Sequence, residues 1–439
     1  MSKYLFVTGK LALRALERTL EPLGLDGGYR IEALRITVAA LMNTEFIARH
    51  LTGVEEEVVV IPGLCKGSLD VIEKACGCRV IKGPKDLKEI PQFFGCSEAV
   101  QVITKPKIKI LAEIVEAPQM TVDEILERAA FYKESGADII DIGTELHGEF
   151  GHLKKVVTAL KRERYQVSID SLRPEDILIA TEAGADMVLS INSSNIQVAG
   201  DLDCILVVIP DDDRDLKSLF DNVEKLLALK KDIVIDPILP PLMFGFVEGV
   251  GRYIKVREKF PSVPVLMGTG NVTELTDADS TGINAVLVGM ATELDIDYLL
   301  TTECSARARG AVKEISIARQ LMHTARESGV LPKHLDYSLL TSKDPQLLPY
   351  TEAELREIKS LIKDRNYRIF IDGQYIYIFN SRVFLRGKEA ETLFKQIEIS
   401  DSAHAFYLGR ELEKAELALK LGKKYVQDSE LRWGYLNDH

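Results

Sequence analysis

Short apolar runs alternate with amphipathic stretches through the middle of the chain, and this rhythm predicts strands and helices in turn. The apolar runs lie at 108–115, 138–142, 166–170, 187–192, 204–210, 233–236, 263–269 and 298–302. Helical spacing of apolar positions fills most of the intervals, as at 121–135, 153–162, 174–183 and 216–230. A run that is apolar at nearly every position is typical of a parallel strand buried on both faces. Eight such strands with helices between them predict a closed (β/α)₈ barrel of the TIM type, and an open doubly wound sheet is the alternative.

The segment before the predicted barrel has the same alternation on a smaller scale. Its apolar runs are Tyr4–Thr8, Val58–Pro62 and Arg79–Ile81, with helical spacing after the first and second. Short strands that alternate with helices predict a layered α/β domain of the Rossmann type. We expect this domain to cover residues 1–104 and the barrel to cover residues 105–330.

The segment after the barrel has a different pattern. A stretch with two prolines, 341–351, is typical of a linker. Beyond it, two apolar runs flank Asp372–Gly373, a strong hairpin signal, and a long helix with a charged face is expected at 403–421. This pattern predicts a small α+β domain over residues 350–439. The fold class expected for the whole chain is therefore α/β, with a central barrel between two smaller domains.

Composition narrows the classes of function. The chain has 439 residues, of which 46% are hydrophobic and 28% charged, and a formal net charge of −12. A duplex nucleic-acid binder normally has a basic face, and no basic run stands out here. No apolar run reaches 18 residues and the N-terminus leads directly into a predicted strand, so we expect no membrane span and no signal peptide. Six cysteines without metal-site or redox spacing fit reduced thiols and a cytoplasmic location.

Polar residues collect where the predicted barrel strands end. They are Glu113, Asp141, Glu145, Asp170, Asn192, Asp236, Asn271, Thr302 and Glu303. Active sites of such barrels lie at the C-terminal ends of the strands, so these side chains are expected on one rim. A single carboxylate there often only caps the next helix. Buried polar groups without partners cost about 1–3 kcal/mol each, so a set of this size predicts a ligand rich in hydrogen-bonding groups, such as a polar heterocycle.

Several of these strand ends resemble those of dihydropteroate synthases, in the order found in that family. The matching stretches, for the second, third, fourth, sixth and seventh strands, are 136–145, 168–171, 183–192, 235–237 and 265–271. Each stretch is short, and their combination is specific for the pterin-binding barrel superfamily. On this basis the chain is identified as a member of that superfamily.

The resemblance implies that Asp170, Asn192 and Asp236 hold a pterin ring. The aminopyrimidinone edge of a pterin offers a ring N–H and an exocyclic amine, and one carboxylate such as Asp236 can accept a hydrogen bond from each. Asn192 can both donate and accept at the other ring nitrogens, and Asp170 is expected at the far edge. The other expected site residues are Glu145, Thr302 and Glu303 for substrate binding and Asn271 and Glu113 for catalysis.

The chain departs from dihydropteroate synthases where those enzymes meet the leaving diphosphate. Their Ser–Arg–Lys run after the seventh strand is replaced by Gly270–Val272, and their Arg–x–His at the eighth by Leu300–Thr302. Glu113 stands where their first strand carries an asparagine that helps to bind the metal and diphosphate. The cations that could substitute are Lys255, Arg257, Arg307 and Arg309. The stretches around Glu113 and Asn271 are more similar to the methyltransferase branch, which uses methyl-tetrahydrofolate or methyl-tetrahydromethanopterin.

The three-part layout resembles the dihydropteroate synthase-related proteins of archaea and methylotrophs that use tetrahydromethanopterin. The main hypothesis is therefore a transferase that joins a dihydropterin-methyl diphosphate to an arylamine phosphate, with Mg²⁺ assisting departure of the diphosphate. One alternative is a methyltransferase that passes the methyl group of a methyl-tetrahydropterin to a corrinoid protein or a thiol. A second alternative is a non-catalytic pterin-binding protein. Analogy with the superfamily implies a homodimer.

Overall fold

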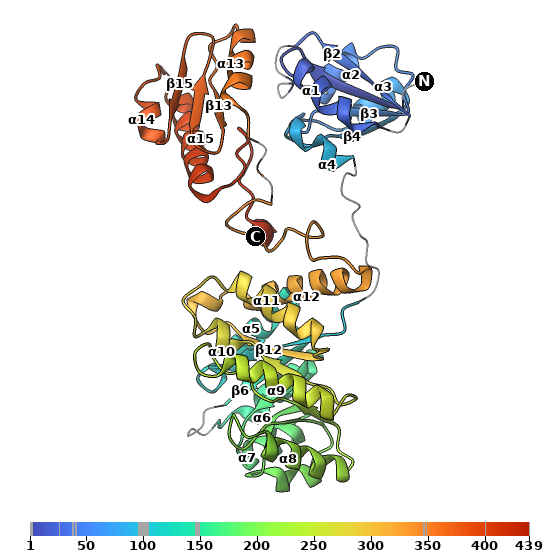
Figure 1. The fold of residues 1–439 in the computed structure, drawn as a ribbon, viewed down its shortest axis with the longest axis vertical. Helices are drawn as coiled ribbons and strands as arrows, with labels where there is room; N and C mark the ends of the chain where they lie inside the picture. Colours follow the sequence, from blue (N-terminus) through green and yellow to red (C-terminus); the bar gives the residue numbers. More distant parts are fainter. Residues whose placement is uncertain are drawn as a thin grey trace. The chain divides into compact units, whose positions relative to one another are not determined.

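The chain forms two compact units (Figure 1). The computed structural model describes residues 3–25, 27–36, 39, 42–94, 105–144, 150–345, 347, 349–399 and 401–438. One unit covers residues 100–339, and the other combines residues 1–99 with residues 340–439. The two flanking segments thus fall in one unit, and their division into separate domains at 1–104 and 350–439 stays a prediction.

Eight parallel strands of the first unit form the predicted barrel. They are β5 Lys109–Ile114, β6 Ile139–Gly143, β7 Gln166–Asp170, β8 Met187–Ile191, β9 Ile205–Val208, β10 Ile233–Ile235, β11 Leu266–Gly268 and β12 Tyr298–Thr302. Their order is β10-β9-β8-β7-β6-β5-β12-β11. A parallel bridge between Ile235 and Val265 joins the two ends of this order and closes the ring. The closed barrel is confirmed, and the open doubly wound sheet is excluded.

Helices surround the strands, as Figure 1 shows. They are α5 Val122–Ser135, α6 Leu153–Arg162, α7 Pro174–Glu182, α8 Leu216–Ala228, α9 Phe246–Lys259, α10 Gly270–Thr273, α11 Ser280–Glu293 and α12 Ala311–Ser328. Short 3₁₀ helices lie at Ala117–Gln119, Ile196–Asp201 and Ala306–Ala308. Along β5, Leu111 packs with strand residues inside the barrel, whereas Ile110 and Ala112 pack in the larger core towards the helices. This alternation follows from the two-residue period of a strand.

The helix α5 shows how local sequence sets an element's limits. Thr121 accepts a hydrogen bond from the backbone N–H of Glu124, whose side chain accepts one from the Thr121 N–H in return. This capping box begins the helix. Gly136 ends it with φ at +110°, and a Cβ there would lie 2.2 Å from the hydroxyl oxygen of Ser316. A glycine is therefore needed at this position both for its backbone angle and for its close contact with α12.

The N-terminal part of the second unit has a four-stranded parallel sheet, in the order β2-β1-β3-β4. Its strands are β1 Tyr4–Gly9, β2 Tyr29–Leu34, β3 Val58–Ile61 and β4 Arg79–Lys82, and its helices are α1 Leu13–Leu20, α2 Thr44–His50, α3 Asp70–Cys76 and α4 Ile90–Phe93. The 3₁₀ helices are Glu21–Leu23 and Leu87–Glu89. The expected Rossmann-like layer is confirmed, with β2 as an additional strand that the apolar pattern did not indicate.

The C-terminal part of this unit has an antiparallel sheet of three strands. Its elements are α13 Glu352–Leu361, β13 Arg368–Ile371, β14 Ile376–Phe379, β15 Phe384–Gly387, α14 Ala390–Phe394, α15 Ser402–Leu421 and the 3₁₀ helix Gly434–Asp438. The hairpin and the long helix are confirmed, and β15 and α14 are additions. Among the described residues of the whole chain, no helix combines the length and the apolar character that crossing a membrane requires. A cytoplasmic location stays a prediction.

Candidate functional site

The carboxylates of the rim follow from the alternation inside the barrel. Glu113 lies two residues beyond the interior residue Leu111, and Asp141 lies two beyond the interior residue Ile139. Asp236, which directly follows β10, likewise lies two residues beyond an interior residue, Val234. Because alternate residues of a strand point to the same face, these side chains point into the mouth of the barrel at the C-terminal ends of its strands.

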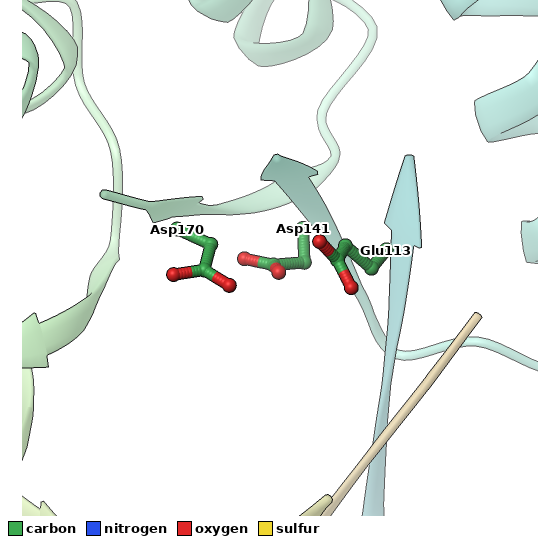
Figure 2. Close-up of side chains that lie close together, drawn as sticks. All are labelled: Glu113, Asp141 and Asp170. Atoms are coloured by element: carbon green, nitrogen blue, oxygen red, sulfur yellow. The ribbon is translucent and has the colours of Figure 1, made fainter. Parts of the chain in front are cut away.

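Three of the carboxylates converge. Glu113 is paired in register with Asp141 of the next strand, and Asp170 ends the strand after that. One oxygen from each of the three lies within 4.8 Å of the others. Figure 2 shows their carboxyl groups side by side, with Asp141 between the other two. We call Glu113, Asp141 and Asp170 the acidic cluster.

Asp141 is the central and most deeply buried member of the acidic cluster. Its side chain is inaccessible to solvent. Its Oδ1 accepts a hydrogen bond of 2.5 Å from the hydroxyl of Ser168, which is also buried. Its Oδ2 is buried and has no hydrogen-bond partner within the part of the chain that the structure describes. A buried carboxylate oxygen without a hydrogen-bond partner lowers the stability of the fold. Such an oxygen is typical of a position where a ligand supplies a hydrogen-bond donor or a cation.

Burial and mutual repulsion disfavour negative charge on the acidic cluster. Burial, and then the charge of Asp170, raise the pKa of Glu113 to about 8. Burial, and then Asp170 and Glu113, hold the pKa of Asp141 well above its usual range, although the Ser168 hydroxyl acts in the opposite direction. Burial, and then the charge of Asp236, raise the pKa of Asp170 to about 6. Two carboxylates about 4 Å apart repel each other by about 4 kcal/mol at an effective dielectric constant of 20, so three bare charges are unfavourable here.

Asp236 is held in a defined orientation by the segment that follows it and by α9. Its Oδ1 accepts hydrogen bonds from the Ile238 N–H at 2.8 Å and from the Tyr253 hydroxyl at 3.0 Å. Both bonds end on the same oxygen, and among the described residues Oδ2 is left for a ligand. Burial raises the pKa of Asp236 to about 6, against the lowering effects of Ile238, Tyr253 and Arg252.

Arg252 and Tyr253 support the site, although neither the strand pattern nor the family resemblance points to them. Arg252 donates from Nε to the Pro237 carbonyl at 3.2 Å and from Nη2 to the Ile238 carbonyl at 2.9 Å. Both side chains are buried on the inner face of α9, together with Val256. A charged residue on the apolar face of a helix is the signal that could have identified them. Through these bonds α9 fixes the segment that carries Asp236.

Asn192 follows β8 and is also fixed by its neighbours. Its Oδ1 accepts hydrogen bonds from the Ser194 N–H at 3.0 Å and the Ser194 hydroxyl at 2.6 Å. Its own backbone N–H donates to Asn195 Oδ1 at 2.9 Å, and the Asn195 amide donates to the Ser190 carbonyl at 3.0 Å. The side-chain Nδ2 of Asn192 is therefore the group best placed to serve a ligand, as a donor.

Asn271 and Thr302 lie at the ends of the last two barrel strands. Asn271 belongs to α10, is exposed, and donates from Nδ2 to the Leu239 carbonyl at 3.1 Å. This bond joins α10 to the segment after β10 that carries Asp236. Thr302 is paired in register with Glu113, and the Thr302 hydroxyl lies 3.5 Å from the Glu113 carbonyl oxygen. Asn271 thus borders the segment that carries Asp236, and Thr302 borders Glu113.

Glu303, also expected in the site, contacts the helix that follows it. The Oε1 of Glu303 accepts a hydrogen bond of 3.0 Å from the Val312 N–H in the first turn of α12, so this carboxylate caps a helix. A substrate-binding role for Glu303 stays a prediction, and it would fall to the other carboxylate oxygen, Oε2. Glu145 lies outside the described residues.

Arg257 does not lie where a diphosphate would leave. Its guanidinium donates to the Val263 carbonyl at 3.0 Å and lies 3.3 Å from an oxygen of Asp297. Both partners precede barrel strands, so Arg257 is at the end of the barrel opposite to the acidic cluster. Arg307 follows β12 and therefore lies at the C-terminal ends of the strands, where its guanidinium pairs with Asp277 at 3.0 Å. The suggestion that Arg257 replaces the missing cations is therefore wrong.

Gly143, at the end of β6, leaves the space that Glu113 occupies. A Cβ at this position would lie 2.9 Å from Glu113 Oε1 and 3.0 Å from the Cα of Val115. The contact with backbone cannot be relieved by a side-chain rotation, so we expect Gly143→Ala to lower the free energy of unfolding by about 1–3 kcal/mol. Urea denaturation measures this difference. Gly268→Ala is the matched control, because a Cβ at that strand end meets nothing within 4 Å, and equal stability of the two variants would contradict the geometry.

Three family models match separate parts of the chain. Residues 116–227, within the barrel, match the family described as "Pterin binding enzyme". Residues 2–85 match a family described as being of unknown function. Residues 360–428 match a family described as PterinBD-DUF4346.

The chain is similar over nearly its whole length to an uncharacterized protein of Methanocaldococcus jannaschii. The two are 29% identical over an alignment of 527 positions, which covers 98% of this chain and 99% of the relative. Among solved structures, the chain is similar to dihydropteroate synthase of Yersinia pestis with a pterine-sulfa conjugate, at 18% identity and a TM-score of 0.40, covering 50% of this chain and 94% of the other. The enzyme of Burkholderia cenocepacia complexed with 7,8-dihydropteroate has 18% identity and a TM-score of 0.40, covering 52% and 94%.

Proposed function

Because the central barrel belongs to the pterin-binding enzyme superfamily, we propose that it binds a reduced pterin at the C-terminal ends of its strands. The observation that carries this proposal is the state of Asp236. Two hydrogen bonds fix its Oδ1, and its Oδ2 is left to accept from a ligand. Asn192 contributes a donor, and Asp170 contributes a second carboxylate. These three groups suit a ring edge that carries both donors and acceptors.

The reaction that we propose is transfer of a pterin-methyl group from diphosphate to an arylamine phosphate. The amine nitrogen attacks the methylene carbon, the bond from that carbon to the diphosphate oxygen breaks, and the amine loses a proton to solvent. Asp170, Asn192 and Asp236 hold the ring in place. The protein's contribution is then mainly to position the two reactants, an effect that can supply several kcal/mol of the barrier. Asn271 and Glu113, the expected catalytic residues, lie at the ends of two other strands of the same rim.

Diphosphate release tests this reaction. The full chain is mixed with the dihydropterin-methyl diphosphate and an arylamine phosphate, and diphosphate is measured over time with and without the amine. The proposal requires release that depends on both reactants. If release stays at background while a methyl-tetrahydropterin binds tightly, the transferase proposal fails and methyl transfer takes its place.

Methyl transfer has one observation in its favour. The Nδ2 of Asn271 is engaged by the Leu239 carbonyl, so its Oδ1 is the atom available to a ligand. By resemblance to the methyltransferase branch, an asparagine at this position contacts the pterin near the nitrogen that carries the methyl group. Asn271→Ala distinguishes the two reactions, because it is expected to reduce methyl transfer more strongly than diphosphate release. The arylamine, a corrinoid partner, the homodimer and a role in tetrahydromethanopterin biosynthesis stay predictions.

The affinity for a reduced pterin is expected to fall as the pH drops through about 6. Asp236 Oδ2 accepts hydrogen bonds from the ring only when the carboxyl group is ionised, and burial raises its pKa to about 6. Protonation below this value removes the acceptor, so affinity is retained above pH 6 and lost below it. Fluorescence titration between pH 5 and pH 8 measures the midpoint.

Tyr253→Phe supplies the control for this pH dependence. The Tyr253 hydroxyl bonds to the ionised form of Asp236 and lowers the pKa of that carboxyl. Its removal is expected to move the midpoint to higher pH. Because the ligand is the same in both titrations, its own ionisation cancels in the comparison. An affinity that does not change between pH 5 and pH 8, or identical midpoints for the two proteins, would contradict the role of Asp236.

A further inference from the structure

The acidic cluster combines two independent features that point to a ligand. The first is convergence: three carboxylates from consecutive strands place one oxygen each within 4.8 Å of the others. The second is the state of Asp141, whose side chain is fully buried and whose Oδ2 has no partner among the described residues. Figure 2 shows this carboxyl group between those of Glu113 and Asp170. A buried central acid with one unpartnered oxygen, between two other carboxyl groups, indicates a site that is completed by a positively charged group.

The chemistry of the three side chains limits what that group can be. All of the possible metal ligands are carboxylate oxygens, which suit hard divalent cations such as Mg²⁺ and Mn²⁺. Such a cation holds oxygens at about 2.1 Å in an octahedron, so neighbouring ligands are about 3 Å apart and opposite ones about 4.2 Å. The three oxygens lie within 4.8 Å of one another, a separation close to these values. An ammonium group is the alternative occupant. It would need the same space and would have to be carried on a long aliphatic chain of a side chain or a ligand.

We propose that Glu113, Asp141 and Asp170 form a binding site for one divalent cation of the Mg²⁺ or Mn²⁺ type. Three carboxylates fill half of an octahedron, and the remaining positions are left for water or for anionic oxygens of a ligand. The Ser168 hydroxyl, bonded to Asp141 Oδ1, holds the central ligand in place. Such an outer partner typically changes metal affinity 10–100-fold when it is removed.

The cation site does not depend on the proposed reaction. Asp236, Ile238 and Tyr253 form the group that would hold the pterin edge, and none of them belongs to the acidic cluster. Asp170 is the one residue with a proposed role in both the cation site and the pterin site. It ends β7, which pairs with β6 on one side and with β8 on the other. A cation held here would lie at the Asp170 end of the pterin, where an anionic substituent of the ligand could complete its coordination.

Mn²⁺ binding to the full chain tests the proposal. The protein is stripped with a chelator, and Mn²⁺ is added while the paramagnetic resonance signal of the free ion is recorded. Wild type is expected to bind one equivalent, with Mg²⁺ as a competitor. Asp141→Asn, which keeps the shape of the side chain, is expected to weaken binding at least about tenfold. Glu113→Gln is the second variant, used because it changes a less buried residue.

Two control variants separate this proposal from other outcomes. Asp213→Asn changes an exposed acid of the loop after β9 and is expected to bind Mn²⁺ like wild type. Asp236→Asn is expected to lose pterin binding and keep the Mn²⁺ site, so a failure of one proposal is distinguishable from a failure of the other. The cation site is overturned if wild type binds no Mn²⁺ at millimolar concentration. It is equally overturned if folded Asp141→Asn and Glu113→Gln proteins bind Mn²⁺ as well as wild type does.

Discussion

Asp236→Asn is expected to weaken the binding of a reduced pterin by at least about 100-fold. In the proposed complex the free Oδ2 accepts hydrogen bonds from the ring N–H and from the exocyclic amine, and bonds to a charged group contribute about 1.5–3 kcal/mol each. A loss of about 3 kcal/mol corresponds to slightly more than two factors of ten in the dissociation constant. The amide also directs an N–H group at a ring edge that itself carries donors. Isothermal titration with a dihydropterin measures the loss.

The matched control for this variant is Asp232→Asn. Asp232 directly precedes β10, at the opposite end of the same strand from Asp236, and its side chain is exposed. It removes the same charge from the chain and is expected to leave pterin affinity unchanged. If the two variants bind the pterin equally well, the ring is not held at the C-terminal ends of the strands, and the proposed site is wrong.

Glu314→Ala is expected to lower the free energy of unfolding of the barrel unit by about 3 kcal/mol or more. This buried carboxylate of α12 accepts hydrogen bonds from the hydroxyl of Ser280 at 2.7 Å, the hydroxyl of Thr281 at 2.6 Å and the amide of Asn284 at 2.8 Å, all on α11. Its removal leaves buried donors without an acceptor, at about 1–3 kcal/mol each. For a unit of this size the melting temperature is expected to fall by about 6–12 °C.

Thermal unfolding followed by circular dichroism measures this change, and hydrogen exchange at α11 and α12 locates it. Glu293→Ala is the control, because Glu293 is an exposed acid on α11. Its replacement is expected to alter stability by no more than about 0.5 kcal/mol. A melting temperature for Glu314→Ala that equals that of Glu293→Ala would show that the buried network does not hold the two helices together.

The barrel could be predicted from the sequence because its strands are buried on both faces and therefore apolar throughout. Its closure was expected from the number of strands, but the residues that close it could not be predicted, because the bridge between Ile235 and Val265 is a long-range contact that leaves no local pattern. The strand β2 was missed for the opposite reason. It lies at the edge of its sheet, half buried, and Arg30 and Glu32 interrupt its apolar residues. In the C-terminal part, β15 is similarly half buried.

The candidate site was predictable to the extent that it follows the two-residue period of the strands. That period places Glu113, Asp141 and Asp236 on the inner face of the rim. It does not tell which acid also caps a neighbouring helix, as the carboxylate of Glu303 does for α12. Nor does it tell which way a surrounding helix faces, and for this reason the support of Asp236 by Tyr253 was not foreseen.

A crystal structure of the full chain with a bound dihydropterin would show directly where the ring is held. We expect the aminopyrimidinone edge of the ring to bond to Asp236 Oδ2, with Asn192 Nδ2 and the Asp170 carboxylate at the ring's other polar positions. Density for the ring at any other place, or an empty rim in crystals grown with saturating ligand, would contradict it.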